Sequence, residues 1–138
     1  MGFVVDASFA AAWMLPDEQT EATDAVMERL TAAPADVPSL FWHEARNLFL
    51  MAERRGRFAP GAAEAAMLRL RRLPIEDRGS GDDKMVLRLA ATHGLTAYDA
   101  AYLALAVGAG AALATLDRKL AGAAGRENIT LLGPLAGP

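Results

Sequence analysis

The sequence predicts an α/β fold, in which a mostly parallel sheet is covered by helices on both faces. Two observations lead to this fold class. Short apolar segments with the composition of strands recur along the chain, and segments with helical periodicity separate them. Strands that alternate with helices in this way are typical of a parallel sheet in a layered domain. The length of 138 residues, without a linker or internal repeat, predicts one domain over residues 1–138.

The first predicted elements are a strand and two helices. Residues 3–5 form an apolar run rich in valine that ends at Asp6, and residues 7–15 follow with a helical pattern. Pro16 ends this helix, because proline donates no backbone hydrogen bond and clashes with the preceding turn. Residues 17–32 show the next helical periodicity, which a further proline closes two residues later.

The middle of the chain is predicted to add two strands and three helices. A brief extended segment at 36–37 precedes Ser39, the expected N-cap of a helix that runs through Arg55 and ends at Gly56. Three elements follow Gly56: an arginine-rich helix over residues 59–73, a strand over 74–76 and, after a glycine-rich loop, a helix over 82–93. Gly94 ends the last of these helices.

The C-terminal part continues the alternation. Thr96 is expected to cap a helix that runs to about residue 107, and residues 111–115 form an apolar strand that leads into Asp117 and a short helix. Residues 129–132 form a final strand before a tail of glycine and proline. Ligand sites in such sheets form beyond the carboxyl ends of the strands.

The composition excludes several classes of protein. Hydrophobic residues make up 53% of the chain and charged residues 22%, which favours a folded, soluble domain over a disordered one. No apolar run is long enough to cross a bilayer, and no basic segment precedes the apolar N-terminal residues as in a secretory signal. A cytoplasmic location is the simplest expectation.

The residue types available for metal binding favour oxygen ligands. The chain has no cysteine, which excludes disulfides, thiolate zinc sites, iron–sulfur clusters and cysteine nucleophiles. His43 and His93 lack the close spacing of a two-histidine zinc motif, so a metal here would be Mg²⁺ or Mn²⁺ held by oxygen. The net charge of −3 gives no overall attraction for nucleic acid, so a polyanion would need local basic patches or metal ions.

Four acidic residues are candidates for a functional site. Asp6 and Asp117 each follow a predicted strand, where a parallel sheet places ligand-binding side chains, although each is equally suited to cap the next helix. Glu44 and Asp99 have no lysine or arginine three or four positions away, so neither has an ion-pair partner on its own helix. The alternatives are a Glu44 side chain that bends out to solvent and a capping box between Thr96 and Asp99.

Taken together, the four acids predict a metal site. Two of them end strands and two lie near helix starts, which places all four on one rim of a parallel sheet. Clustered carboxylates repel one another unless a cation neutralises them. Two divalent ions roughly 3.5–4 Å apart can activate a water and stabilise the leaving oxygen in phosphodiester hydrolysis, without cysteine or histidine.

The segments around these acids resemble the PIN-domain nucleases, in particular the VapC-type toxins of bacterial toxin–antitoxin pairs. The resemblance spans nearly the whole chain, and the order and spacing of the segments carry it. The segments are Val4 to Ser8, Pro38 to Glu44 with Asn47, Tyr98 to Ala106, and Thr115 to Asp117.

The resemblance implies a three-layer α/β/α domain with about five strands. It also implies Mg²⁺- or Mn²⁺-dependent cleavage of RNA, a homodimer, and inhibition by a small cognate antitoxin protein. The residues that it assigns are Asp6, Glu44, Asp99 and Asp117 as catalytic and metal-binding acids, with Ser8 and Thr115 as supporting hydroxyls.

Other polar and aromatic residues are assigned from their local position. Asn47 lies one helical turn after Glu44 and is a candidate to support it by a hydrogen bond, although solvent exposure is the commoner role of such an Asn. His43 points about 100° away from Glu44 around the helix and is assigned to packing or the surface. Arginines within 54–57 and 69–72 could bind phosphates but are expected to be solvated. The aromatic residues expected in the core or an interface are Trp13, Trp42 and Tyr102.

Two rival functions remain open on the sequence. An aspartyl-phosphate phosphatase would use Asp6 as its nucleophile, but the typical pattern of that class places a second acid two residues later, where this chain has Ser8. A non-catalytic binding module would keep the fold and the acids only to engage a partner protein. The metal-dependent ribonuclease is the preferred interpretation.

Overall fold

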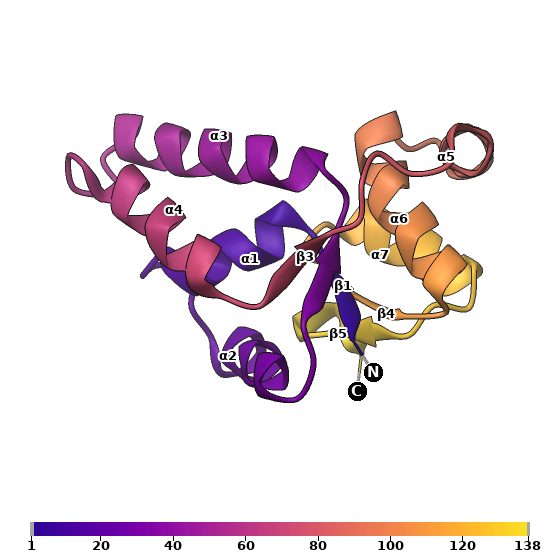
Figure 1. The fold of residues 1–138 in the computed structure, drawn as a ribbon, viewed down its shortest axis with the longest axis horizontal. Helices are drawn as coiled ribbons and strands as arrows, with labels where there is room; N and C mark the ends of the chain where they lie inside the picture. Colours follow the sequence, from indigo (N-terminus) through magenta and orange to yellow (C-terminus); the bar gives the residue numbers. More distant parts are fainter. Residues whose placement is uncertain (1, 138) are drawn as a thin grey trace.

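The computed structural model describes residues 2–137, whose arrangement is shown in Figure 1. The strands are β1 (Phe3–Val5), β2 (Ala35–Val37), β3 (Ile75–Asp77), β4 (Ala112–Ala114) and β5 (Leu131–Leu132). The α-helices are α1 (Ala7–Met14), α2 (Glu21–Glu28), α3 (Leu40–Arg54), α4 (Ala62–Arg72), α5 (Asp83–His93), α6 (Ala97–Ala109) and α7 (Arg118–Arg126). Two 3₁₀ turns are η1 (Arg29–Thr31) and η2 (Pro134–Ala136).

The strands form a five-stranded sheet in which all pairings are parallel, in the order β3-β2-β1-β4-β5. Helices α1 to α4 lie on one side of the sheet, and α5, α6 and α7 lie on the other (Figure 1). This arrangement confirms the three-layer α/β/α fold predicted from the sequence. None of the helices within residues 2–137 is long and apolar enough to span a membrane.

The central strand β1 determines where the functional residues lie. Its residues are all buried, as expected for a strand covered by helices on both faces. Val5 pairs with Ala114 of β4, so the next residues of the two strands, Asp6 and Thr115, leave the sheet side by side. The Asp6 backbone N–H continues the ladder by donating to the Ala114 carbonyl at 3.1 Å.

Two helices whose starts carry candidate acids, α1 and α6, are largely buried. In α1 every residue except Ser8 is buried, because this helix lies between the sheet and α3. In α6 the segment 100–104 is buried against the other face of the sheet. Burial of this extent fixes the starts of the two helices relative to the sheet edge, and it therefore also fixes the positions of Asp6 and Asp99.

The start of α2 differs from the sequence prediction. The periodicity predicts a helix over 17–32, whereas the structure begins it only after Thr20. The side chains of Thr20 and Thr23 each accept a hydrogen bond from the other residue's backbone N–H, at 3.1 and 3.0 Å. This reciprocal cap satisfies two N-terminal donors and sets the boundary, so residues 17–19 form part of the connection from α1.

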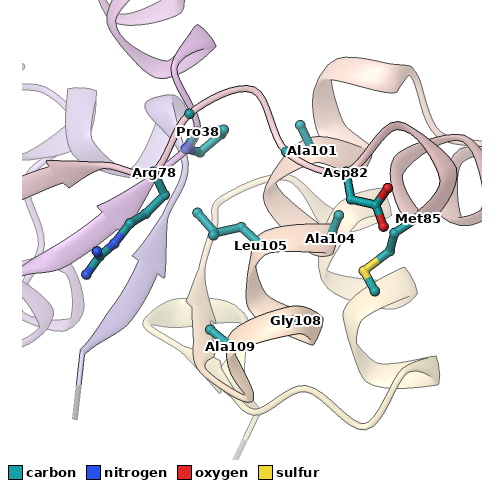
Figure 2. A pocket seen from close by; sticks show the side chains of 11 residues that line it. Pro38, Arg78, Asp82, Met85, Ala101, Ala104, Leu105, Gly108 and Ala109 are labelled. Atoms are coloured by element: carbon teal, nitrogen blue, oxygen red, sulfur yellow. The ribbon is translucent and has the colours of Figure 1, made fainter.

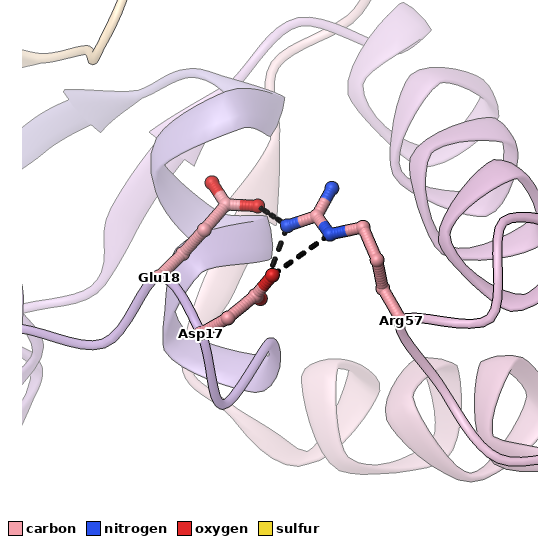
Figure 3. A network of polar contacts seen from close by, with 3 residues as sticks. All are labelled: Asp17, Glu18 and Arg57. Atoms are coloured by element: carbon pink, nitrogen blue, oxygen red, sulfur yellow. Dashed lines mark hydrogen bonds and ion pairs between the residues drawn. The ribbon is translucent and has the colours of Figure 1, made fainter.

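Two acids of this connection bind Arg57, which lies in the turn between α3 and α4 (Figure 3). Its guanidinium donates to both carboxylate oxygens of Asp17, at 2.9 and 3.0 Å, and also to Glu18. The sequence leaves Arg57 as a possible phosphate ligand, but the structure engages it in this ion-pair network. The network joins two connections that are 40 residues apart in the chain.

Smaller differences occur at other boundaries. Ser39 precedes α3 as predicted, but its side chain does not cap the helix and donates instead to Asp77 at 2.7 Å. The reason is that the Ser39 backbone is already helical, which turns its hydroxyl away from the helix N–H groups. Helix α4 starts three residues later than predicted, after Gly61 with its left-handed φ of +84°, and β5 covers only two residues.

Candidate active site

The four acids singled out in the sequence line one cavity at the carboxyl edge of the sheet. Its volume is about 230 Å³. They come from the end of β1, from α3, from the start of α6 and from the connection after β4. None of the described residues that line the cavity is basic. The lining residues are Asp6, Ala7, Ser8, Glu44, Asn47, Leu48, Asp99, Tyr102 and Asp117.

Asp6 is the most deeply buried of the four acids, with 5% of its surface exposed. One carboxylate oxygen, Oδ1, accepts hydrogen bonds from the Phe9 backbone N–H at 2.9 Å and the Ser8 hydroxyl at 2.8 Å. The other, Oδ2, accepts a hydrogen bond from the buried Thr115 hydroxyl. Asp6 therefore caps α1 and also presents a charged group to the cavity, with both oxygens held in place.

Thr115 links two of the acids. Its hydroxyl donates to Asp6 and accepts a hydrogen bond from the Asp117 backbone N–H at 3.0 Å. Asp117 in turn caps α7, since its Oδ1 accepts from the backbone N–H groups of Lys119 and Leu120 at 2.8 and 3.2 Å. The pairing of β1 with β4 thus holds both strand-end acids through one threonine.

Glu44 and Asp99 enter the cavity from helices on opposite sides of the sheet. The Tyr102 hydroxyl donates to Glu44 Oε1 at 2.5 Å. The backbone N–H of Asp99 donates to the Thr96 side chain at 3.1 Å, which caps α6, and the Thr96 side chain and the charge of Lys119 both act to lower the pKa of Asp99. The Asp99 backbone therefore takes part in the α6 cap while the residue also lines the cavity.

Burial and mutual repulsion raise the pKa of three of the acids. Burial raises the pKa of Asp6 from its ordinary 3.8 to about 6, against the opposing effect of its hydrogen bonds. The pKa of Glu44 is raised mainly by burial, with a contribution from the negative charge of Asp99. The pKa of Asp99 is raised by burial and then by Asp117. The negative charge of Glu44 also contributes to raising the pKa of Asp6, so each of these three acids experiences the charge of a neighbouring acid.

The donor set of the cavity suits a hard divalent cation. It consists of carboxylate and hydroxyl oxygens, the ligands that Mg²⁺ and Mn²⁺ prefer. In the present conformation, no three acidic or histidine side chains among residues 2–137 are arranged closely enough to hold an ion. Hydrogen bonds from Ser8, Phe9 and Thr115 fix the Asp6 carboxylate.

Other residues considered from the sequence take different places. Asn47 lies on the cavity wall but is exposed and has no hydrogen bond to Glu44 among the described residues. His43 is exposed and contacts Arg46 through Nδ1 at 2.8 Å, outside the cavity lining. The guanidinium of Arg71 lies 4.0 Å from the centre of the Trp42 ring, a cation–π contact on the surface between α3 and α4.

The sequence interpretation missed the position of the Tyr102 hydroxyl. The residue is assigned there to the core or an interface, and its side chain is in fact 1% exposed, but its hydroxyl reaches the acidic cavity. The available signal was its spacing of three residues from Asp99, which places both on one face of α6.

A larger cavity of about 450 Å³ lies beside α6 (Figure 2). Its wall is mostly apolar and is made by α6, the start of α5 and the segment after β3. Arg78 is the only basic side chain in the described lining of this cavity. It forms ion pairs with Asp36 of β2 and Glu76 of β3. The chemistry-bearing side chains gather at the smaller, acidic cavity.

Comparison with known proteins places the chain in a family. The PIN domain family matches residues 3–126, and the chain belongs to this family. Ribonuclease VapC3 of Pyrobaculum aerophilum is 34% identical over 127 residues, covering 88% of this chain and 93% of the relative. Among solved structures, the crystal structure of PAE2754 from Pyrobaculum aerophilum is similar, with a TM-score of 0.71 and 26% identity over 89% of this chain and 79% of that chain.

Proposed function

We propose that this protein is a Mg²⁺- or Mn²⁺-dependent endoribonuclease and the toxin of a type II toxin–antitoxin pair. The observation that carries the proposal is the acidic cavity, which four carboxylates from separate elements line without a basic residue in the described lining. Membership of the PIN domain family and the similarity to a ribonuclease named VapC3 support the same reaction class.

The proposed roles follow from the contacts at the cavity. The carboxylates that would hold the cations are those of Asp6, Glu44, Asp99 and Asp117. Bound divalent cations supply activation of a water and stabilisation of the leaving phosphodiester oxygen. The hydroxyls of Ser8 and Thr115 orient the Asp6 carboxylate, because they donate to its two different oxygens. Asn47 lines the same cavity one helical turn after Glu44 and is proposed as a supporting residue for that acid.

Cations bound by the acids would also allow a protein with net charge −3 to bind RNA. Phosphate groups would be repelled by the bare carboxylates, so the chain depends on cations at the point of contact. RNA is therefore the proposed substrate, and a small antitoxin protein and a second copy of the chain are the proposed protein partners.

The nuclease proposal is tested by incubating the purified protein with several RNAs and Mg²⁺ or Mn²⁺. Cleavage is expected with either cation, and EDTA is expected to abolish it. Asp6→Ala should be inactive, whereas Glu64→Ala, which removes an exposed acid on α4 far from the cavity lining, should cleave like the wild type. Cleavage that survives EDTA would contradict the metal-dependent mechanism.

Two further outcomes separate the rival functions. Hydrolysis of small phosphate monoesters with a phosphoryl adduct on Asp6 would favour the aspartyl-phosphate phosphatase. Inactivity on all RNAs after removal of every co-purifying protein would favour a binding module. The antitoxin proposal is tested separately, by asking whether the small product of a neighbouring gene binds the protein and inhibits cleavage.

A further inference from the structure

We propose that Tyr102 is a positioning residue that fixes the Glu44 carboxylate in the acidic cavity. Its hydroxyl donates to Glu44 Oε1 at 2.5 Å and is the only side-chain donor to Glu44 among the described residues. The inference rests on the proposed function, since it concerns how one of the proposed metal-binding acids is held. The sequence reasoning and the family assignment give this residue no role at the site.

The position of Tyr102 makes it a fixed donor. Its side chain is 1% exposed, so packing determines the ring orientation and little conformational freedom is lost when the hydrogen bond forms. Tyr102 belongs to α6 and Glu44 to α3, helices on opposite sides of the sheet (Figure 1). The hydrogen bond therefore joins the two helical layers across the sheet edge, at the cavity itself.

A neutral donor suits a carboxylate that must remain available to a cation. Lysine or arginine at this position would hold Glu44 equally well but would neutralise its charge and repel a metal ion. The phenol uses one oxygen, Oε1, and leaves Oε2 without a donor among the described residues. Phenylalanine would fill the same buried space, so the contribution of the hydroxyl can be separated from that of the ring.

The experiment compares Tyr102→Phe with the wild type and with Tyr98→Phe. Tyr98 is a matched control, because it lies on the same helix next to Asp99 but is 66% exposed and outside the cavity lining. Mn²⁺ affinity is measured by calorimetry, and the ¹³C NMR signal of the Glu44 carboxyl group is recorded in metal-free protein. Tyr102→Phe is expected to weaken Mn²⁺ binding about 10-fold and to shift the carboxyl signal, with neither change in the control.

The results distinguish the positioning role from the nuclease proposal. Unchanged Mn²⁺ affinity together with an unchanged carboxyl signal in Tyr102→Phe overturns the positioning role, and so do equal changes in Tyr98→Phe. If both predicted changes occur but the wild type cleaves no RNA, the positioning role stands and the nuclease proposal fails. If the wild type binds no Mn²⁺, the metal-dependent function fails and the carboxyl signal alone decides the role of Tyr102.

A second variant guards against a folding defect in Tyr102→Phe. Glu44→Ala removes the acceptor from a partly exposed position on α3, where the smaller side chain is easily accommodated. The ¹³C signal of the Tyr102 ring carbon that bears the hydroxyl is then expected to shift relative to the wild type. An unchanged signal would show that the contact does not exist in solution and would overturn the proposal.

Discussion

Asp6→Asn is expected to remove a pH-dependent loss of stability from the metal-free protein. The wild-type carboxylate is buried and lies in a cavity with three other acids, so ionisation there costs free energy. Asparagine has nearly the same shape and keeps one carbonyl oxygen as acceptor for the α1 cap, but it carries no charge. The substitution therefore tests the electrostatics of the cavity more directly than alanine does.

The sign and size of the effect follow from the raised pKa of Asp6. In the unfolded chain this carboxyl ionises near 3.8, whereas burial raises its pKa in the folded protein to about 6. Between these values the folded state binds more protons, so the contribution of Asp6 to stability falls as pH rises and levels off above about pH 6. At about 1.4 kcal/mol per pKa unit, the whole loss is about 3 kcal/mol.

Urea unfolding in EDTA, from below pH 4 to above pH 7, measures this effect. The free energy of unfolding of Asp6→Asn minus that of the wild type should rise by about 3 kcal/mol across this range. The lost acceptor for Thr115 adds a pH-independent cost on the order of 1–2 kcal/mol and does not alter the slope. Mg²⁺ should then stabilise the wild type at neutral pH but not the variant.

The control is Asp82→Asn, which changes another helix-capping aspartate, at the exposed start of α5. Because this aspartate is exposed, its substitution removes no buried carboxylate, and it serves as the comparison at each pH. A difference for Asp6→Asn that stays constant from pH 4 to pH 7 would refute the reasoning, because it would mean that Asp6 ionises as easily in the cavity as in the unfolded chain.

Three further predictions concern other contacts. Thr115→Val should lower Mn²⁺ affinity and RNA cleavage by about 10-fold while Thr115→Ser largely preserves both, and equal loss in the two variants would contradict a role for the hydroxyl. Gly133→Ala should lower the unfolding free energy by roughly 1–3 kcal/mol more than Gly137→Ala, since both glycines have left-handed φ but only at Gly133 would the added carbon overlap the Phe9 ring. Arg57→Ala should lower the melting temperature slightly at low salt, and a difference that persists unchanged at high salt would argue against the ion-pair network of Figure 3 as its cause.

The fold could be predicted because its strands and helices have different periodicities. The run at 3–5 is too short for a helix and is followed at once by an apolar segment that suits one, and the structure places β1 and α1 there. Helix ends marked by glycine were also predictable, as at Gly56 and Gly94, which have left-handed φ values of +75° and +65°. The start of α2 was not, because a threonine pair without an acidic partner is a less familiar cap.

The sequence allowed the acidic residues of the candidate site to be identified, but not their positions relative to one another. The absence of a basic neighbour three or four residues from Glu44 or Asp99 is visible in the sequence. Their approach across the sheet edge depends on the packing of α3 and α6, which lie far apart in the chain. The contact of Tyr102 with Glu44 spans 58 residues for the same reason, and a buried tyrosine is ordinarily a core residue.

Capping and cavity lining are competing interpretations of Asp6 and Asp117 in the sequence, but the structure combines them. Both aspartates cap helices and both line the acidic cavity. The starts of α1, α6 and α7 carry partial positive charge, which offsets part of the repulsion among the acids in the absence of a cation. This compensation is partial, because the pKa of Asp6 is still raised to about 6. The helix starts therefore offset part of the repulsion in a cavity whose described lining has no basic residue, and the uncompensated charge is what the proposed cations would neutralise.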